Sequence, residues 1–442
     1  MRLSEHSYRT VTSLAGPILF LENVRNAKIG EVVNVKTGEG RNIEGEVLSI
    51  DRGKVLIEVY GESQGLDLGH TSVVFTDSVK KIPLSRDIVG RSFNGSFEPI
   101  DGLPMYIPDR YEAITGVPIN PASRSGPEEF ISTGLSVIDG LNTLVKGQKL
   151  PVFSASGLPS REVVAFILKH ATTLAAEKNF MVVFAALGLS FHDYSFYMET
   201  LQQMASGYTA FITMADDPVM ERLLAPRYAL TVAEYLAFEH DMDVLVIMTD
   251  MTNYCDALRE IATARKELPG RRGYPGYMYS DLASLYERAG RVNGKSGSVT
   301  MLPLLTMPED DITHPIPDLT GYITEGQIVL SRELHQKSIF PPVDALPCLS
   351  RLMNSGIGKG KTREDHRIVA NLLYKYYAKG RKLRKLEAII GREGLSSDDR
   401  VMLDFADGFE KHFIHQGEKP RDIFQTLDEG RNILAQFSLD LP

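Results

Sequence analysis

One segment of the sequence has the setting of a phosphate-binding loop without its chemistry. The apolar run of residues 150–153 is followed by a polar turn and then by a segment with helical periodicity. A P-loop places G-x-x-x-x-G-K-S/T at such a turn, where backbone amides and the Lys hold phosphates and the hydroxyl holds magnesium. Here Ser154 and Pro159 replace the two glycines, Ser160 replaces the Lys, and Arg161 replaces the Ser/Thr. The turn therefore lacks the groups that bind magnesium-ATP tightly.

Little of the phosphate-binding pattern remains in this turn. Pro159 has no N–H to donate to a phosphate, and Gly157 is the glycine that remains in this turn. We expect Ser156 and Gly157 to give weak nucleotide binding or none, and we predict no metal ligand. Taken alone, a strand followed by S-A-S-G-L-P is typical of an ordinary turn.

An acidic residue follows a second buried strand. Residues 244–248 are apolar and are followed by Thr249 and Asp250. This is the form of a Walker-B element, whose carboxylate helps to hold magnesium in P-loop enzymes. Many buried strands also end in an Asp that caps the next helix, and we favour that interpretation for Asp250.

Length, charge and cysteine content exclude several classes of protein. The 442 residues are too many for one small domain, and the net charge of −9 argues against binding to nucleic acid through a general basic surface. Cys255 and Cys348 lie far apart, which favours free thiols over a disulfide scaffold or a zinc site. The first ten residues lack a signal-peptide core, and no apolar run approaches the ~20 residues that span a bilayer. We therefore expect a cytoplasmic protein that acts at membranes only through partners.

The elements that must position these residues fall into three parts. Short β-branched strands in residues 1–80, separated by Gly-containing turns, predict a small N-terminal β-barrel. Residues 81–355 contain apolar strands alternating with helical segments, which predicts a parallel α/β sheet of the P-loop NTPase type covered on both faces. Residues 356–442 predict a helical bundle.

Within these parts the periodicity predicts individual helices and their limits. In the α/β part we expect helices over residues 163–176 and 220–238. In the last part we expect helices over the ranges 363–378, 398–413 and 421–437. The segments 379–382 (KGRK) and 391–394 (GREG) contain glycine, which predicts that both interrupt the bundle.

Four longer stretches are far more specific than these short patterns. The first approaches the degenerate loop, and the other three lie downstream of it. Together they resemble the B subunit of the vacuolar and archaeal type of rotary ATPase, over nearly the whole chain. The stretches are residues 129–140 with 147–151, residues 268–279 (LPGRRGYPGYMY), residues 310–326 (DDITHPIPDLTGYITEG) and residues 341–352 (PPVDALPCLSRL).

The resemblance implies a place for the chain in a larger machine. In that family, three non-catalytic, regulatory B subunits alternate with three catalytic A subunits around a central stalk, supported by peripheral stalks. The ring couples ATP synthesis or hydrolysis to proton or sodium movement through a separate membrane sector. ATP or ADP with Mg²⁺ is expected at the interface with the catalytic subunit, which carries the intact P-loop. The family's catalytic carboxylate matches Leu189 here, which cannot polarise a water.

One functional group is carried over by the resemblance. In this family the Arg of the L-S-R stretch reaches the neighbouring subunit's ATP site, and Arg351 matches it. A planar, permanently charged guanidinium can pair with the γ-phosphate oxygens on which charge develops. Two other hypotheses remain open: an autonomous or catalytic hexameric ATPase, such as a secretion ATPase or a helicase, and a purely structural ring spacer.

Overall fold

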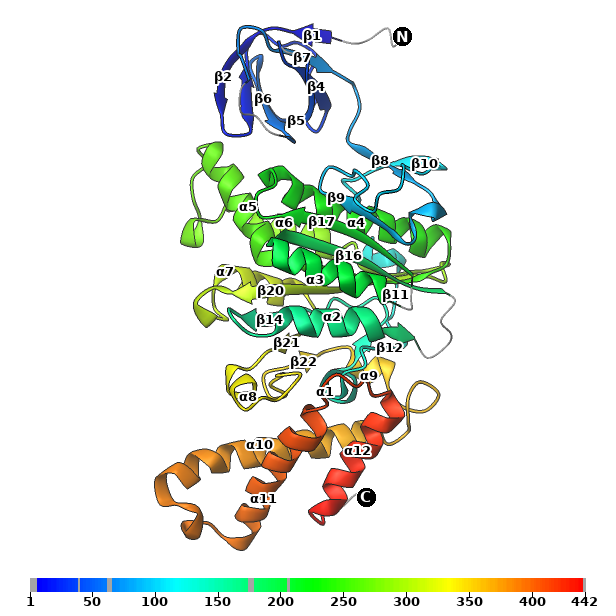
Figure 1. Cartoon of the computed structure of the whole chain (residues 1–442), viewed down its shortest axis with the longest axis vertical. Helices are drawn as coiled ribbons and strands as arrows, with labels where there is room; N and C mark the ends of the chain where they lie inside the picture. Colours follow the sequence, from blue (N-terminus) through cyan, green and yellow to red (C-terminus); the bar gives the residue numbers. More distant parts are fainter. Residues whose placement is uncertain (1–5, 39, 62–65, 174–178, 205–206, 440–442) are drawn as a thin grey trace.

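The N-terminal part of the chain is an antiparallel β-barrel, at the top of Figure 1. The computed structural model describes residues 6–38, 40–61, 66–173, 179–204 and 207–439. Seven strands pair in the order β1-β7-β4-β5-β6-β3-β2 around a core of buried valines and isoleucines, Val33, Val47 and Ile57 among them. The strands are β1 (His6–Tyr8), β2 (Val11–Ala15), β3 (Ile18–Leu21), β4 (Val32–Lys36), β5 (Asn42–Asp51), β6 (Lys54–Val59) and β7 (Ser72–Phe75).

The middle part of the chain is built on a mostly parallel sheet. Its main path runs in the order β22-β21-β14-β20-β18-β16-β17-β9, and β22 at one edge pairs antiparallel to β21. The strands of this path are β9 (Arg91–Asn94), β14 (Val152–Ala155), β16 (Phe180–Leu189), β17 (Gly207–Met214), β18 (Asp243–Thr249), β20 (Ser298–Met307), β21 (Gly326–Val329) and β22 (Leu349–Ser350).

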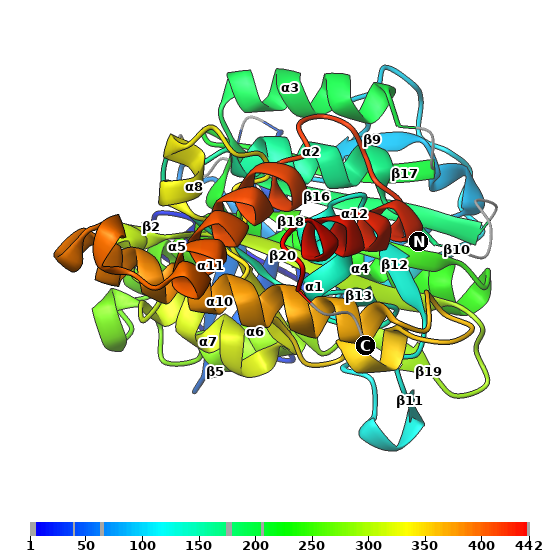
Figure 2. The ribbon, with the colours of Figure 1, turned by 90° about the horizontal axis from the view of Figure 1, so that it is seen from below.

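Apolar residues on both faces of the central strands explain why helices cover the sheet on both sides. Along β16, Met181 and Val183 belong to one buried cluster, whereas Val182 and Phe184 belong to the other. Figure 2 shows helices on both sides of the strands. One face carries α2 (Ser160–His170) and α3 (Phe191–Gln202); the other carries α4 (Val219–Glu239), α5 (Met251–Ala264) and α6 (Met278–Tyr286).

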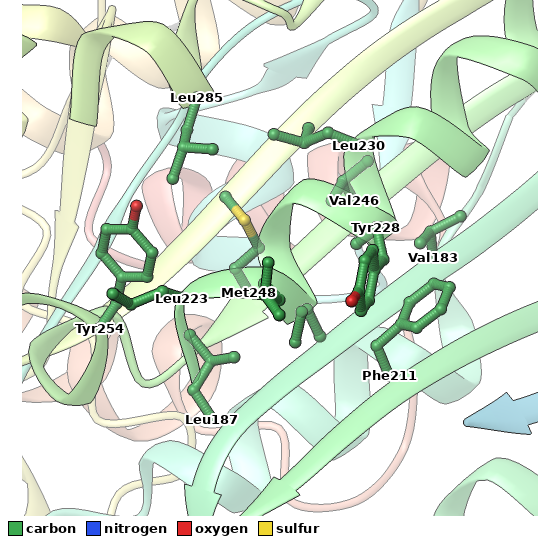
Figure 3. Close-up of a cluster of buried hydrophobic side chains, with 14 of the residues drawn as sticks. Val183, Leu187, Phe211, Leu223, Tyr228, Leu230, Val246, Met248, Tyr254 and Leu285 are labelled. Carbon is green, nitrogen blue, oxygen red and sulfur yellow. The ribbon is translucent and has the colours of Figure 1, made fainter. Parts of the chain in front are cut away.

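The core beneath α4 joins side chains from sheet and helices. Figure 3 shows Tyr228 of α4 beside Phe211 of β17, and Met248 of β18 lies between the strands and α4. All three side chains are buried. The ends of the central strands, where site residues lie, are therefore held by a closely packed scaffold.

Smaller elements connect the main layers. The short strands are β8 (Lys81–Leu84), β10 (Arg110–Ala113), β11 (Arg124–Ser125), β12 (Phe130–Ser132), β13 (Leu144–Val145), β15 (Thr172–Thr173) and β19 (Gly290–Val292). The short helices are α1 (Ser136–Leu141), α7 (Pro315–Ile323), α8 (Arg332–Gln336) and α9 (Met353–Gly356), with single turns at Arg86–Ile88, Pro121–Ser123, Arg271–Gly273, Pro308–Asp310 and Arg392–Gly394.

One predicted helix in the α/β part ends early. Helix α2 stops at His170, and Thr172 and Thr173 instead form β15, which pairs with β12. The end of the predicted range, residues 174–176, lies outside the described residues. Tertiary strand pairing outweighs the local helical pattern here.

The C-terminal part is helical, at the bottom of Figure 1. It contains α10 (His366–Ile390), α11 (Ser397–Gly408), the π-helical turn η7 (Phe409–Ile414) and α12 (Ile423–Gln436). The predicted break at residues 379–382 is wrong, because α10 runs through it without interruption. A Cβ at Gly380 would lie 2.5 Å from both Ala406 Cβ and Met402 O of α11. This glycine therefore permits close helix packing and does not end a helix.

None of the helices in the described ranges is long and apolar enough to cross a bilayer.

Candidate functional site

A cleft of about 490 Å³ lies where the central strands end and α2 begins. Gly157, Pro159, Ser160 and Arg161 line it from the degenerate loop. Further lining comes from the ends of β16 and β18 and from α3 and α5: Leu187, Gly188, Leu189, Asp193, Tyr197, Thr249, Asp250 and Asn253. The structure thus brings the sequence-predicted loop, Leu189 and Asp250 together at one edge of the sheet, where ligands bind in open α/β folds.

The loop keeps the backbone shape of a strand-to-helix turn. Gly157 has φ +77°, a conformation that glycine adopts without strain, and no heavy atom lies within 4 Å of a Cβ built there. Pro159 is the N-cap of α2 and makes no capping hydrogen bond with its side chain. Ser156 is exposed beside this turn, and its carbonyl accepts a hydrogen bond from Arg332 Nη2 at 2.9 Å. The exposed backbone of Ser156 and Gly157 is what the loop can offer a phosphate.

Arg161 is already neutralised by the protein. Its Nη1 donates to Asp193 Oδ1 at 3.0 Å, its Nε donates to Glu162 Oε1 at 2.9 Å, and its guanidinium lies over the Phe196 ring. Burial opposes ionisation of Asp193, but hydrogen bonds from Ser190 and Arg161 lower the pKa of its carboxyl. The carboxylates of Asp193 and Glu162 thus neutralise the positive charge of Arg161, which could otherwise attract a phosphate.

Asp250 acts as a helix cap, as the favoured interpretation predicts. Its Oδ1 accepts hydrogen bonds from the backbone N–H groups of Thr252 at 2.8 Å and Thr306 at 3.1 Å. Burial raises the pKa of this carboxyl. A carboxyl group that is used to tie α5 to β20 is poorly suited to bind magnesium.

The cleft therefore does not fit magnesium-ATP in a catalytic arrangement. Its carboxyl groups, Glu162, Asp193 and Asp250, all accept hydrogen bonds within the protein, and buried Leu189 stands at the end of β16. Among the described residues no group of three or more His, Cys, Asp or Glu side chains is arranged to hold a metal ion.

Arg351 lies far from this cleft, at the opposite end of the sheet. It directly follows β22, where Ser350 pairs with Gly326, and its N–H donates to Glu325 O at 2.9 Å. Ile328 pairs with Val152 in the parallel ladder, so Gly326, two residues earlier, lies level with residue 150, just before β14 begins. Gly157 comes after the other end of β14. Residues 150 to 155 alone span about 17 Å at ~3.3 Å per residue. Arg351 cannot reach the cleft of its own chain.

The guanidinium of Arg351 is available for an external partner. The residue is exposed, and within the described ranges its side chain has no hydrogen bond or ion pair. Most other arginines near the sheet are paired, as Arg161 is with Asp193 and Arg332 with Asp310. An unpaired, permanently charged group on an anchored backbone is suited to binding an anion on another molecule.

The three parts of the chain match known families. Residues 11–77 match the ATP synthase alpha/beta family, beta-barrel domain. Residues 134–350 match the nucleotide-binding domain of the same family, and residues 355–440 match the C-terminal domain of V and A type ATP synthase.

Relatives of full length make the assignment more specific. The chain is 65% identical to a V-type ATP synthase beta chain of Geotalea uraniireducens over the whole of both sequences. It is 54% identical to the V-type ATP synthase beta chain of Thermus thermophilus, over 97% of this chain and 91% of the relative. The chain belongs to the V-type ATP synthase beta (B) subunit family.

A solved structure supports the same fold for this B subunit. The ATP synthase subunit NeqB from Nanoarchaeum equitans superposes with a TM-score of 0.75 at 40% identity, covering 96% of this chain and all of that one. The predicted barrel, nucleotide-binding α/β part and C-terminal domain of a rotary ATPase subunit are confirmed. As a V-type ATP synthase subunit, the chain is part of a multi-subunit complex. The chain itself contains a nucleotide-binding domain of this family.

Both cysteines of this B subunit are buried free thiols. Cys348, three residues before Arg351, donates from Sγ to Asp344 O at 2.9 Å and accepts from the Val329 N–H at 3.1 Å. Burial raises the pKa of its thiol to about 12, so it is an unreactive structural group.

Sequence reasoning missed the polar residues beneath Arg351. Gln148 and Lys149 are buried and contact the strand pair that carries the arginine. Both lie in the stretch GQKLP that contributes to the family resemblance, but nothing in their spacing shows that residues 148–149 and 350–351 meet. Only the fold brings these segments together.

Proposed function

We propose that this B subunit is non-catalytic and regulatory, and that it completes the ATP site of a neighbouring catalytic A subunit by supplying Arg351. The observation that carries this proposal is the placement of Arg351, which is exposed, unpaired among the described residues and at the opposite end of the sheet from its own cleft. In that role Arg351 acts in trans on the γ-phosphate. The cleft near Ser156 and Gly157 binds nucleotide weakly or not at all.

The proposal includes the partners and the place of the subunit. Three B and three A subunits alternate in a ring around a central stalk, with peripheral stalks, and ATP or ADP with Mg²⁺ is held mainly by the A subunit. The ring couples ATP synthesis or hydrolysis to proton or sodium transport. It lies on the cytoplasmic side and meets the membrane sector only through other subunits. No nucleic acid takes part.

The magnitude expected of Arg351 follows from phosphoryl-transfer chemistry. Negative charge spreads over the γ-phosphate oxygens in the transition state, and a guanidinium placed there lowers the barrier. Arginine fingers contribute about 10³- to 10⁵-fold in rate, or about 4–7 kcal/mol. This lowering of the barrier depends on the positive charge of the arginine and on where the charge is placed, so both must be tested.

The test replaces Arg351 in the assembled complex. We expect Arg351→Ala to lower ATP hydrolysis at least ~10²-fold and Arg351→Lys to restore only part of it, because an ammonium lacks the planar fork. Arg110→Ala removes another exposed arginine, already paired with Glu112, and serves as the matched control with unchanged turnover. Assembly is checked by native mass spectrometry. Near-normal hydrolysis by assembled Arg351→Ala complex would reject the finger and favour a structural spacer.

The cleft is tested separately with the purified B subunit. We expect any ATP affinity measured by calorimetry to be weak and almost unaffected by magnesium, because the carboxylates of the cleft are bonded within the protein. Turnover of ATP by the B subunit alone, at the rate of a catalytic ring, would instead establish an autonomous ATPase.

A further inference from the structure

Buried polar side chains lie directly beneath the strand that ends at Arg351. Gln148 is completely buried, and its Nε2 donates to Ser350 Oγ at 2.9 Å and to Glu325 O at 3.4 Å. Its Oε1 accepts from the Val145 N–H at 3.0 Å, so both the oxygen and the NH₂ group of the side-chain amide are hydrogen-bonded. The Gln148 side chain thus connects the chain before β14 to the residue that precedes Arg351.

Lys149 fixes the other strand of the pair. Its Nζ lies 2.8 Å from Glu325 Oε1 and 2.9 Å from Glu287 Oε1, and only 4% of its side chain is exposed. Its backbone N–H donates to Glu325 Oε2 at 2.8 Å, and its carbonyl accepts from the Glu325 N–H at 3.0 Å. Glu325 is therefore held by both backbone and side chain, and its carbonyl accepts the N–H of Arg351.

Further contacts leave little freedom to the backbone next to Arg351. Ser350 Oγ donates to Thr143 O at 2.9 Å, which ties β22 to a second segment of the α/β part. A Cβ at Gly326 would lie 2.0 Å from Leu349 O, so β21 and β22 approach as closely as glycine allows. The backbone at residues 349–351 is fixed from several sides, while the guanidinium of Arg351 stays free.

Such a cluster is an inefficient way to gain stability. Burying a glutamine amide and a lysine ammonium costs free energy, and their hydrogen bonds only offset this cost. Apolar residues of the same volume often give a core equal or greater stability. What the cluster does provide is a defined position, because each bond fixes a direction as well as a distance. A misplacement of about 1 Å can cost ~10²-fold in rate.

We infer that Gln148 is a positioning residue for Arg351, supported by the pairing of Lys149 with Glu325. This inference rests on the proposed role of Arg351 in trans. Gln148 does not touch the nucleotide of the neighbouring subunit. It acts by holding Ser350 and Glu325, and through them the backbone from which the Arg351 guanidinium extends.

A double-mutant cycle on the assembled complex tests this inference. ATP hydrolysis is measured over a range of ATP concentrations for Gln148→Leu, Arg351→Ala and the double variant, so that both kcat and KM are obtained. We expect Gln148→Leu to lower kcat about 10- to 100-fold with KM for ATP nearly unchanged. The double variant should match Arg351→Ala within about twofold, because the effect of Gln148 passes through the arginine. Gln148→Asn retains an amide and should be less impaired than Gln148→Leu.

The matched control is Gln416→Leu. Gln416 is also a buried glutamine, and its side chain bonds Ser136 N, Gly134 O and Lys419 O, far from β22 in the chain. It should lose stability without losing kcat in the assembled complex. Each outcome has a distinct meaning. If Arg351→Ala is impaired but Gln148→Leu is normal, or if the two effects multiply, the positioning role is rejected and the finger stands. If Arg351→Ala is normal, the proposed function itself fails.

Discussion

Replacing Glu410 by Gln should loosen the junction between the α/β part and the C-terminal helices. Glu410 lies in η7 with its side chain 4% exposed. It accepts from Arg384 Nη1 at 2.5 Å and from Tyr377 Oη at 2.9 Å, both on α10, and from Lys337 Nζ at 3.0 Å, just after α8. One buried carboxylate thus joins three elements, and Lys337 brings in the α/β part.

The magnitude follows from the burial and from the charge left behind. Removing one partner of a buried ion pair costs about 3–5 kcal/mol, because the remaining charge is uncompensated. Lys337 is 40% exposed and also pairs with Glu333, so water and that second partner relieve part of the cost. We therefore expect Glu410→Gln to cost about 3 kcal/mol. Burial opposes ionisation of Glu410, but the hydrogen bonds and charge of Arg384 together with hydrogen bonds from Lys337 and Tyr377 lower the pKa of its carboxyl. The cost should therefore be full at neutral pH and should disappear in acid as the wild-type carboxyl protonates.

Native-state hydrogen exchange is the suitable assay, because unfolding of a multidomain chain is not two-state. The opening free energy of α10 and η7 is compared between wild type, Glu410→Gln and Asp407→Asn. Asp407 also contacts Arg384 at 2.5 Å, but its side chain is 64% exposed, so its loss should cost only about 0.2–1 kcal/mol. Equal losses in the two variants, or a loss below about 1 kcal/mol in Glu410→Gln, would refute the argument from burial.

Two further predictions concern stability. Gly380→Ala should destabilise the C-terminal helices by about 1–2 kcal/mol because its Cβ would crowd α11. Gly321→Ala in α7, where a Cβ meets nothing within 4 Å, should stabilise that helix by about 0.5–1 kcal/mol. Native-state hydrogen exchange of α10 and α7 in the two variants checks this, and the same sign for both would contradict it. Burial raises the pKa of Glu58 from 4.5 to about 7, so ionisation opposes folding and barrel stability should fall by about 3 kcal/mol between those pH values. Glu58→Gln should lack this fall in hydrogen exchange of β6, and parallel pH curves for the two proteins would exclude the effect.

Much of the fold follows from local sequence patterns. Buried strands such as β16 and β18 are continuous apolar runs, and such runs predict a covered parallel sheet. The errors arise where tertiary contacts decide. Gly380 resembles a helix breaker in the sequence, but it faces α11 at a distance that only glycine permits. Strand β9 has the sequence RSFN without an apolar run, so only its pairing with β17 identifies it.

The candidate site could be predicted only in part. Loss of the phosphate Lys and the magnesium hydroxyl at Ser160 and Arg161 is visible in the sequence. The engagement of Arg161 by Asp193 is not visible, because the two residues are brought together by the packing of α2 against α3. The same is true of Gln148 and Ser350, which are 202 residues apart in the chain.

The placement of cleft and Arg351 at opposite ends of one sheet also constrains how such subunits associate. If the cleft and Arg351 both face neighbours, as in the proposed ring, the two contact surfaces are unlike and the contact is heterologous, whereas association about a two-fold axis would bring like ends together. In the proposed ring each arginine then serves a single boundary. A preparation in which some B subunits lack Arg351 would contain a discrete mixture of rings, with none, one, two or three boundaries impaired. It would not contain a uniform population of slower rings.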